Sequence, residues 1–229
     1  MQRTNSASGT AGGFLLKALI FANGELELPP NWQALQGQAD LVLAADGGSR
    51  YVKALGLELD AIVGDMDSIS ADERAQLEAQ GVDLVSHPAE KDHTDLELAL
   101  QEAQARGATQ LWVLAALGRR WDHSFANLML AAREDFRQLA ITYLHGPQRL
   151  FLIRGQRRLQ EPVGTRISLI PLGGQAQGVR TAGLHYPLNR ENLPLGSSRG
   201  VSNLAVEAEQ LVELSEGTLL CVLSPGNLN

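Results

Sequence analysis

The chain has 229 residues, of which 44% are hydrophobic, enough to build a substantial core without staples. Its formal net charge is −7, and no block of lysine and arginine occurs. Nucleic-acid recognition needs a concentrated basic surface, so the composition argues against a nucleic-acid partner and favours a small-molecule ligand. No run approaches the roughly 20 apolar residues of a membrane span, so no membrane partner is expected.

The beginning of the chain and its cysteine content bear on location. Residues 1–13 are rich in Ser, Thr, Gly and Ala and lack the apolar segment of a secretory signal, which predicts a disordered tail. The single Cys221 lies in an apolar run and cannot pair within the chain, as is typical of a reducing compartment. Together these features predict a cytoplasmic protein.

Residues 14–146 alternate short apolar runs with helix-like stretches. Ser70 to Glu73 and Thr94 to Glu97 are typical of capping boxes, and Gly81 and Gly107 lie where helices should end. The alternation predicts an α/β domain with a Rossmann-like, mainly parallel sheet and flanking helices. The expected strands are residues 15–22, 41–45, 61–63, 82–86, 111–115 and 139–144.

Residues 147–229 lose the helical period and show short alternating segments between Gly, Pro and Asn. This pattern predicts a smaller all-β domain of sandwich or barrel type, with no long helix. Residues 188–203 are expected to form a long polar loop. The expected strands are residues 149–154, 157–160, 166–171, 178–181, 204–208, 210–215 and 218–224.

Aspartates follow four successive predicted strands of the first domain. In an open α/β sheet, ligands bind beyond the carboxyl ends of the strands, so these side chains should gather at one edge. Asp65 and Asp67 stand two apart in a chain expected to be extended, which puts both carboxylates on one side, within reach of one cation. Oxygen-only ligands indicate Mg²⁺. The aspartates are Asp46, Asp65, Asp67, Asp92, Asp95 and Asp122.

The alternative interpretation is that these residues only cap helices and form turns, the usual role of Asp beside Gly or Ser. Capping is sufficient for Ser70 and Thr94. It does not account for Asp65 and Asp67 together, nor for the recurrence of Asp after four strands.

Several neighbours of the aspartates have two interpretations. Gly47 and Gly48 either make a turn or let the backbone approach a phosphate. Lys91 and Arg120 suit a polyphosphate, although each could be a surface ion-pair partner. His123 opens a helix, where a structural hydrogen bond is as expected as catalysis.

As a set, the motifs resemble those of the thiamine pyrophosphokinase family. They stand here as Ala45 to Gly48, Gly64 to Ser68, Lys91 to Asp95 and Gly118 to His123. Residues 22–24, 183–188 and 200–203 are also similar to family motifs. Arg119 departs from the family, which usually has a second glycine there, and a side chain at that position would narrow the loop.

The resemblance implies Mg²⁺-dependent transfer of a diphosphate from ATP to the hydroxyl of thiamine, giving thiamine diphosphate and AMP. It also implies a homodimer with the site between subunits. The implied metal ligands are Asp46, Asp65, Asp67 and Asp95. The implied catalytic residues are Asp65, Asp67, Asp92, Asp95, Arg120 and Asp122. Nucleotide binding would fall to Asp46, Gly47, Gly48, Lys91, Arg120, Asp122 and His123, and thiamine binding to Tyr186, Ser202 and Asn203.

Two other functions stay open on the residues alone. The metal and ATP motifs do not identify the acceptor, so another acceptor such as a hydroxymethylpterin is possible, and this alternative depends on Tyr186, Ser202 and Asn203. A nucleotide-binding regulatory module without turnover is the other. The intact Asp65, Asp67, Asp95 and Arg120 argue against it, because a decayed site would be expected to lose a metal ligand.

Overall fold

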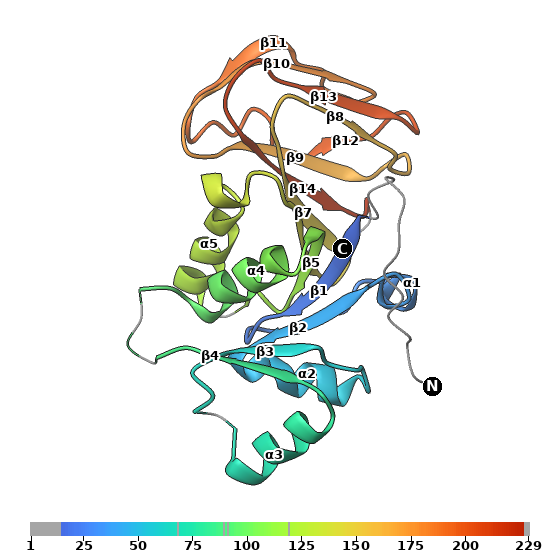
Figure 1. Ribbon diagram of the computed structural model, residues 1–229. Helices are drawn as coiled ribbons and strands as arrows, with labels where there is room; N and C mark the ends of the chain where they lie inside the picture. Colours follow the sequence, from blue (N-terminus) through green and yellow to red (C-terminus); the bar gives the residue numbers. More distant parts are fainter. Residues whose placement is uncertain (1–14, 68, 89, 91, 119, 227–229) are drawn as a thin grey trace, which may run out of the picture.

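The computed structural model describes residues 15–67, 69–88, 90, 92–118 and 120–226, so the predicted tail at 1–13 lies outside the described residues. One sheet of ten strands runs through the molecule, and a second sheet of four strands packs over one end of it (Figure 1). The order in the large sheet is β12-β9-β14-β7-β6-β5-β1-β2-β3-β4. The predicted combination of a mainly parallel sheet with helices and a second β region is confirmed.

The parallel part of the large sheet contains six strands. The chain starts at β1, moves outward through β2, β3 and β4, then returns to lay β5 against the other side of β1. The topological switch point therefore lies between β1 and β5, where open α/β sheets bind ligands. The strands are β1 (Leu16–Phe21), β2 (Leu41–Ala45), β3 (Ala61–Gly64), β4 (Asp83–Ser86), β5 (Ala108–Leu114) and β6 (Ala140–His145).

Helices cover both faces of this parallel part. Alternate residues of β1 point to opposite faces: Ala18 and Ile20 pack toward α4 and α5, and Leu19 and Phe21 toward α1 and α2. Among the described residues, no helix is long and apolar enough to cross a membrane. The helices are α1 (Trp32–Gln36), α2 (Ser49–Ala54), α3 (Ala71–Ala79), α4 (Asp95–Ala105) and α5 (Trp121–Leu130), with 3₁₀ turns η1 (Asp46–Gly48) and η2 (Glu134–Phe136).

The predicted helix signals are confirmed. The hydroxyl of Ser70 accepts a hydrogen bond from the Glu73 amide at 3.2 Å, and that of Thr94 accepts one from the Glu97 amide at 3.3 Å. Gly81 and Gly107 follow α3 and α4 with φ of 82° and 88°, a conformation that glycine adopts without strain.

The chain after β6 is antiparallel. One end of the large sheet faces the small sheet, with order β11-β10-β13-β8, across an apolar core, as in a sandwich. No helix occurs in the described residues from 147 to 226, as predicted. The strands are β7 (Gln148–Ile153), β8 (Gln156–Leu159), β9 (Arg166–Pro171), β10 (Ala176–Ala182), β11 (Asn189–Leu193), β12 (Asn203–Leu204), β13 (Gln210–Glu213) and β14 (Leu219–Ser224).

Two expectations in this half were wrong in detail. The segment 188–203, expected to be a loop, contains β11, which pairs with β10 although its polar sequence shows little hydrophobic alternation. The strand expected at 204–208 is only the short β12, paired with β9 at the sheet edge. An edge strand with one partner carries a weak pattern, which explains both errors.

The predicted division between residues 146 and 147 falls at a hairpin inside the large sheet. His145 of β6 pairs with Gln148 of β7, so hydrogen bonding continues across this point. The division into two domains there stays a prediction.

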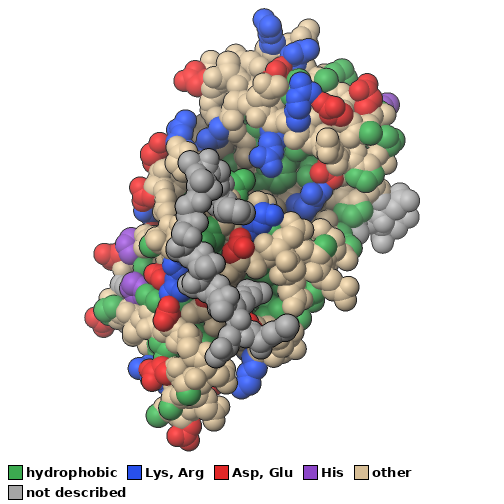
Figure 2. All heavy atoms as spheres, turned by 45° about the vertical axis from the view of Figure 1, so that its right-hand side comes forward, with side chains coloured by type: hydrophobic (Ala, Val, Ile, Leu, Met, Phe, Trp, Pro, Cys, Tyr) green, Lys and Arg blue, Asp and Glu red, His purple; other side chains and the backbone are tan. Residues whose placement is uncertain are grey.

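Surface charge is mixed on the face displayed in Figure 2, where lysine and arginine side chains lie among aspartates and glutamates.

Gly48 shows why the turn after β2 needs glycine. A Cβ atom on Gly48 would lie 2.1 Å from the carbonyl oxygen of Phe21, which belongs to the neighbouring strand β1. The backbone of this turn therefore packs directly on β1, and this packing places Asp46 beside the ends of β1 and β3.

We predict that Gly48→Ala lowers the free energy of unfolding by about 1–3 kcal/mol, because the added methyl group meets backbone that cannot move aside. Gly37→Ala is the matched control. Gly37 has an ordinary helical φ of −68°, and its added Cβ would meet nothing closer than 3.5 Å. Chemical denaturation of both variants measures the difference, and equal stabilities would contradict the packing described here.

Candidate functional site

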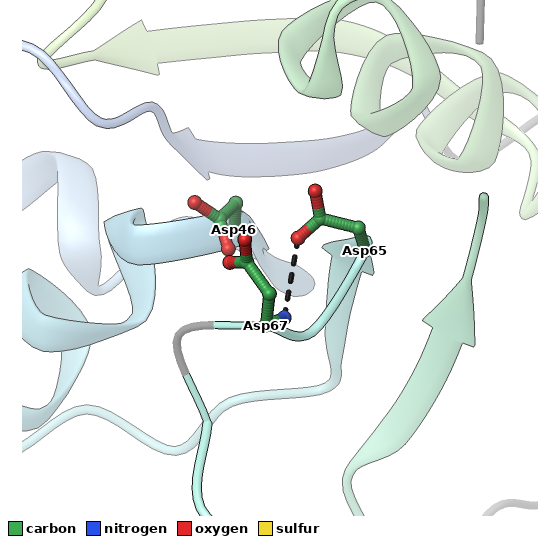
Figure 3. Close-up of side chains that lie close together, drawn as sticks. All are labelled: Asp46, Asp65 and Asp67. Carbon is green, nitrogen blue, oxygen red and sulfur yellow. Dashed lines mark hydrogen bonds between the residues drawn. The ribbon is translucent and has the colours of Figure 1, made fainter. Parts of the chain in front are cut away.

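Three aspartates converge at the carboxyl ends of β2 and β3. Each of Asp46, Asp65 and Asp67 offers a carboxylate oxygen, and these oxygens lie within 4.8 Å of one another. Figure 3 shows the three side chains pointing toward one another, with the Asp67 amide donating to Asp65 Oδ1 at 3.2 Å. The structure thus gathers Asp46 with the Asp65 and Asp67 pair predicted from the sequence.

The backbone after the two strands explains this convergence. Ala45 pairs with Val63, so β2 and β3 end side by side. Asp46 and Met66 have positive φ angles of 45° and 61°, a rare conformation for residues with side chains. The chain after β3 was expected to be extended, but it turns at Met66. The two carboxylates still share one side because the turn folds Asp67 back toward Asp65.

Electrostatics of the cluster favour a cation. The pKa of Asp67 is raised, chiefly by the negative charge of Asp65 and a hydrogen bond with it, then by burial and by the charges of Asp46 and Asp95. The folded form therefore binds a proton at Asp67 more tightly than the unfolded chain does. When no cation is bound, ionised Asp67 opposes folding, and this opposition is lost as the pH falls and the carboxylate is protonated. A divalent cation would relieve the same repulsion at neutral pH. The donor set of carboxylate oxygens fits a hard ion such as Mg²⁺.

A cavity of about 630 Å³ lies at the topological switch point between β1 and β5. Its walls come from the segments that follow β1 and β5 and from the beginnings of α2, α4 and α5. It includes Asp95, which also raises the pKa of Asp67 and so links the cavity to the carboxylate cluster. The size suits a nucleotide.

A group of cavity residues around Arg50 was not predicted from the sequence. Arg50 donates to the side chain of Asn23, to the Asn23 carbonyl at 3.3 Å and to the Tyr51 hydroxyl at 2.9 Å. The Tyr51 hydroxyl in turn donates to the Gly24 carbonyl at 2.6 Å. Arg50 follows the Asp46-Gly47-Gly48 motif closely, so its proximity to that motif was the available signal.

Arg120 and Asp122 form an ion pair at the start of α5. Arg120 Nη2 lies 2.5 Å from Asp122 Oδ2, and Arg120 Nε donates to Oδ1 at 3.2 Å. This pair lowers the pKa of Asp122 to about 2. Arg120 and His123 line the cavity. The geometry fits the predicted orientation of Arg120 by Asp122. The catalytic roles of both residues stay predictions.

Two further side chains fix α5 to the exit of β5. Ser124 Oγ accepts from the Gly118 amide at 3.1 Å, and Asn127 Nδ2 donates to the Ala116 carbonyl at 2.7 Å. Both residues line the cavity, and neither was predicted, because they lie inside an ordinary amphipathic helix. They hold the motif at 118–123 in place.

The fourth predicted motif is only partly described. Lys91 lies outside the described residues, and Asp92 is exposed and is not among the described residues that line the cavity. Glu97, expected only to cap α4, is buried and receives a hydrogen bond from Arg133 at 2.6 Å. The same carboxylate lies 3.0 Å from Nδ1 of His93, a cavity residue. The start of α4 is therefore held by an ion pair in which the Glu97 carboxylate is buried and the Arg133 side chain is partly exposed.

The predicted thiamine residues lie elsewhere in the fold. Asn203 is buried on β12 and binds the main chain of Tyr186 in both directions, accepting at 3.0 Å and donating at 2.7 Å. Tyr186 is 59% exposed, and Ser202 has a positive φ of 59°. Asn203 thus fixes the loop that presents Tyr186, and the three residues form one local unit.

The class of protein follows from matches to two family models. The model "Thiamin pyrophosphokinase, catalytic domain" matches residues 32–143, and "Thiamin pyrophosphokinase, vitamin B1 binding domain" matches residues 154–219. Together they cover most of the chain and define a transferase of the kinase type. The chain belongs to the thiamin pyrophosphokinase family.

Individual relatives agree with this assignment. The thiamine pyrophosphokinase of Bacillus subtilis is 27% identical over 207 residues, which cover 90% of this chain and 97% of the relative. Thiamine pyrophosphokinase 1 of Arabidopsis thaliana is 28% identical, with 90% of this chain and 85% of the relative covered. The crystal structure of the Bacillus subtilis protein superimposes with a TM-score of 0.80 at 26% identity, covering 92% of this chain and all of that chain.

We predict that Asp67→Asn folds normally and that its melting temperature without metal equals or exceeds that of the parent, because carboxylate repulsion is relieved. Added Mg²⁺ should raise the melting temperature of the parent but have little effect on the variant. Asp72→Asn on the exposed first turn of α3 is the control. A variant that Mg²⁺ stabilises as strongly as the parent would show that Asp67 is only a turn residue.

Proposed function

We propose that the protein transfers a diphosphate group from ATP to the hydroxyl of thiamine, yielding thiamine diphosphate and AMP. The observation that carries this proposal is the carboxylate cluster beside a nucleotide-sized cavity, in a chain whose two parts match the catalytic and vitamin B1-binding models of one family. The match of residues 154–219 favours thiamine over another acceptor.

The reaction requires alignment and charge neutralisation more than covalent chemistry. The thiamine hydroxyl oxygen forms a bond to the β-phosphorus of ATP, and the bond from that phosphorus to the α,β-bridging oxygen breaks. AMP leaves with the electron pair, and the hydroxyl proton passes to solvent or to a nearby base. A bound divalent cation would neutralise phosphate charge during this transfer.

We assign this chain's residues to that reaction as follows. Asp46, Asp65, Asp67 and Asp95 would hold the cation, for which we propose Mg²⁺ because the donors are all hard oxygens. Arg120, oriented by Asp122, would bind phosphate oxygens. Tyr186 would provide an aromatic face for the cationic thiamine ring, and Asn203 would hold Tyr186 in place.

The direct test is product analysis with ATP, Mg²⁺ and a panel of acceptors that includes thiamine and a hydroxymethylpterin. We expect AMP and thiamine diphosphate in equal amounts, with no diphosphate transfer to the pterin. Transfer to the pterin alone, or nucleotide binding without any product, would overturn the proposed function.

We also propose that the protein is a homodimer and that each site uses both subunits. Seven strand-to-strand steps separate β12, which carries Asn203, from β2, which precedes Asp46. At about 4.8 Å per step this is roughly 34 Å, too far for one thiamine to reach from Tyr186 to the carboxylates of the same chain. A second copy related by a two-fold axis could supply the missing half of each site.

Exposed apolar side chains support this arrangement. Trp121 and Phe125 stand one turn apart on α5, where they are 82% and 64% exposed near the cavity residues Arg120 and His123. Tyr186 and Val201 are exposed beside the Asn203 unit. In a symmetric dimer, Trp121 and Phe125 of each copy could contact Tyr186 and Val201 of the other copy. The two equivalent contacts would bury all of these exposed apolar side chains.

A cytoplasmic location is proposed on the single cysteine. Cys221 is free and buried, and burial raises the pKa of its thiol to about 12, so it behaves as an inert core residue that needs no oxidising compartment.

For the acceptor half, we predict that Asn203→Ala raises the KM for thiamine or lowers turnover, because Tyr186 loses both hydrogen bonds that fix its main chain. ATP binding should stay nearly unchanged. Steady-state kinetics with each substrate varied in turn separate the two effects. An equal loss of ATP binding would contradict the placement of Asn203 in the thiamine half of the site.

For the shared site, we predict that mixing two inactive variants restores activity. Asp65→Asn removes one half of each site and Tyr186→Ala the other, so a mixed dimer contains one site with both changes and one intact site. After co-expression or subunit exchange, activity should approach about a quarter of the parent value, since half of the dimers are mixed. No recovery in verified mixed dimers would show that each site lies within one chain.

A further inference from the structure

Two arginines among the described residues line the cavity, and their charges are balanced differently. Arg120 contacts both carboxylate oxygens of Asp122. The low pKa of Asp122 keeps that carboxylate ionised at neutral pH, so the pair carries little net charge. The hydrogen bonds that the described residues make with Arg50 all go to neutral oxygens, those of Asn23 and the Tyr51 hydroxyl. Arg50 therefore brings a net positive charge to the cavity wall.

The side chain of Arg50 is also held in place. Its guanidinium carbon stands 4.5 Å from the centre of the Tyr51 ring, and the Tyr51 hydroxyl donates to the Gly24 carbonyl. Gly24 is itself tied to the exit of β5 by its amide, which donates to the Ala115 carbonyl at 2.6 Å. The cation is thus fixed against the segment that follows β1, which is itself bonded to the segment that follows β5, and less conformational entropy remains to be lost on binding.

Three of the five N–H donors of a guanidinium are used by these bonds, which leaves two for a ligand. A triphosphate carries more negative charge than one divalent cation removes, so a second positive group is required near the metal. Arg50 is the second residue of α2, which directly follows the 3₁₀ turn that begins at Asp46. It lies where a nucleotide's phosphates would pass from the cluster into the cavity.

We propose that Arg50 binds the polyphosphate chain of the nucleotide and that Tyr51 and Asn23 are the residues that position it. This inference rests on the proposed function for the identity of the nucleotide. The alternative is that the stacked Arg50 and Tyr51 pair contacts the adenine base.

Equilibrium binding distinguishes the two, without turnover and without thiamine. Calorimetry in Mg²⁺ would use α,β-methylene-ATP, inorganic tripolyphosphate and adenosine as probes. Arg50→Met should weaken binding of the first two by about 10- to 100-fold and leave adenosine unchanged. Arg50→Lys, which keeps the charge but loses the planar fork, should lose less. Tyr51→Phe, which removes one bond that holds the guanidinium, should weaken binding of α,β-methylene-ATP and of tripolyphosphate and leave adenosine binding unchanged.

The control is Arg74→Met, which removes one positive charge from the exposed surface of α3. Thermal unfolding of every variant checks the fold. An equal loss for adenosine would assign Arg50 to the base, and unchanged triphosphate binding in a folded Arg50→Met protein, or no nucleotide binding by the parent, would overturn the proposal. If the parent protein binds the analogue but forms no thiamine diphosphate, the proposed reaction is refuted, whereas the binding experiment still decides the role of Arg50.

Discussion

Mutual repulsion among Asp46, Asp65 and Asp67 is the constraint around which the site is organised. Three carboxylates within 4.8 Å are unfavourable unless a cation or a proton joins them. The fold holds them together nonetheless, because β2 and β3 are buried parallel strands whose ends are fixed by the sheet. Stability gained in the apolar core thus keeps a cation-binding arrangement in place, which accounts for the left-handed conformations of Asp46 and Met66.

The cavity depends on the same sheet. Chain order places β1 between β2 and β5, and the segments that leave β1 and β5 run side by side, because the amides of Gly24 and Glu25 donate to the carbonyls of Ala115 and Leu117. Both segments line the cavity at this switch point. Ser124 and Asn127 anchor α5 to one wall, and Arg50 with Tyr51 ties the other wall to Gly24. Metal cluster and cavity are therefore adjacent as a consequence of topology, and a nucleotide in the cavity would direct its phosphates to the carboxylates.

Much of this fold was predictable from the sequence, because hydrophobic periodicity and capping boxes report local structure. The strand at Leu41–Ala45 and the caps at Ser70 and Thr94 are examples. The gathering of Asp46 with Asp65 and Asp67 was predictable from their places after successive strands. For Arg50 the proximity to the Asp46 motif was the only signal. Asn127 was not predictable, since an asparagine in a helix has many ordinary uses until tertiary structure shows what it faces. The polar β11 was missed because strand pairing, and not local pattern, defines it.

The central claim, that the aspartate cluster binds a divalent cation, can be tested without any assay of turnover. Crystals grown with Mn²⁺ in place of Mg²⁺ allow the ion to be located by its anomalous scattering. The account predicts one strong peak among Asp46, Asp65 and Asp67, with carboxylate oxygens at about the 2.0–2.2 Å expected for such ions. An occupied manganese site elsewhere, with these three carboxylates left free of metal, would contradict it.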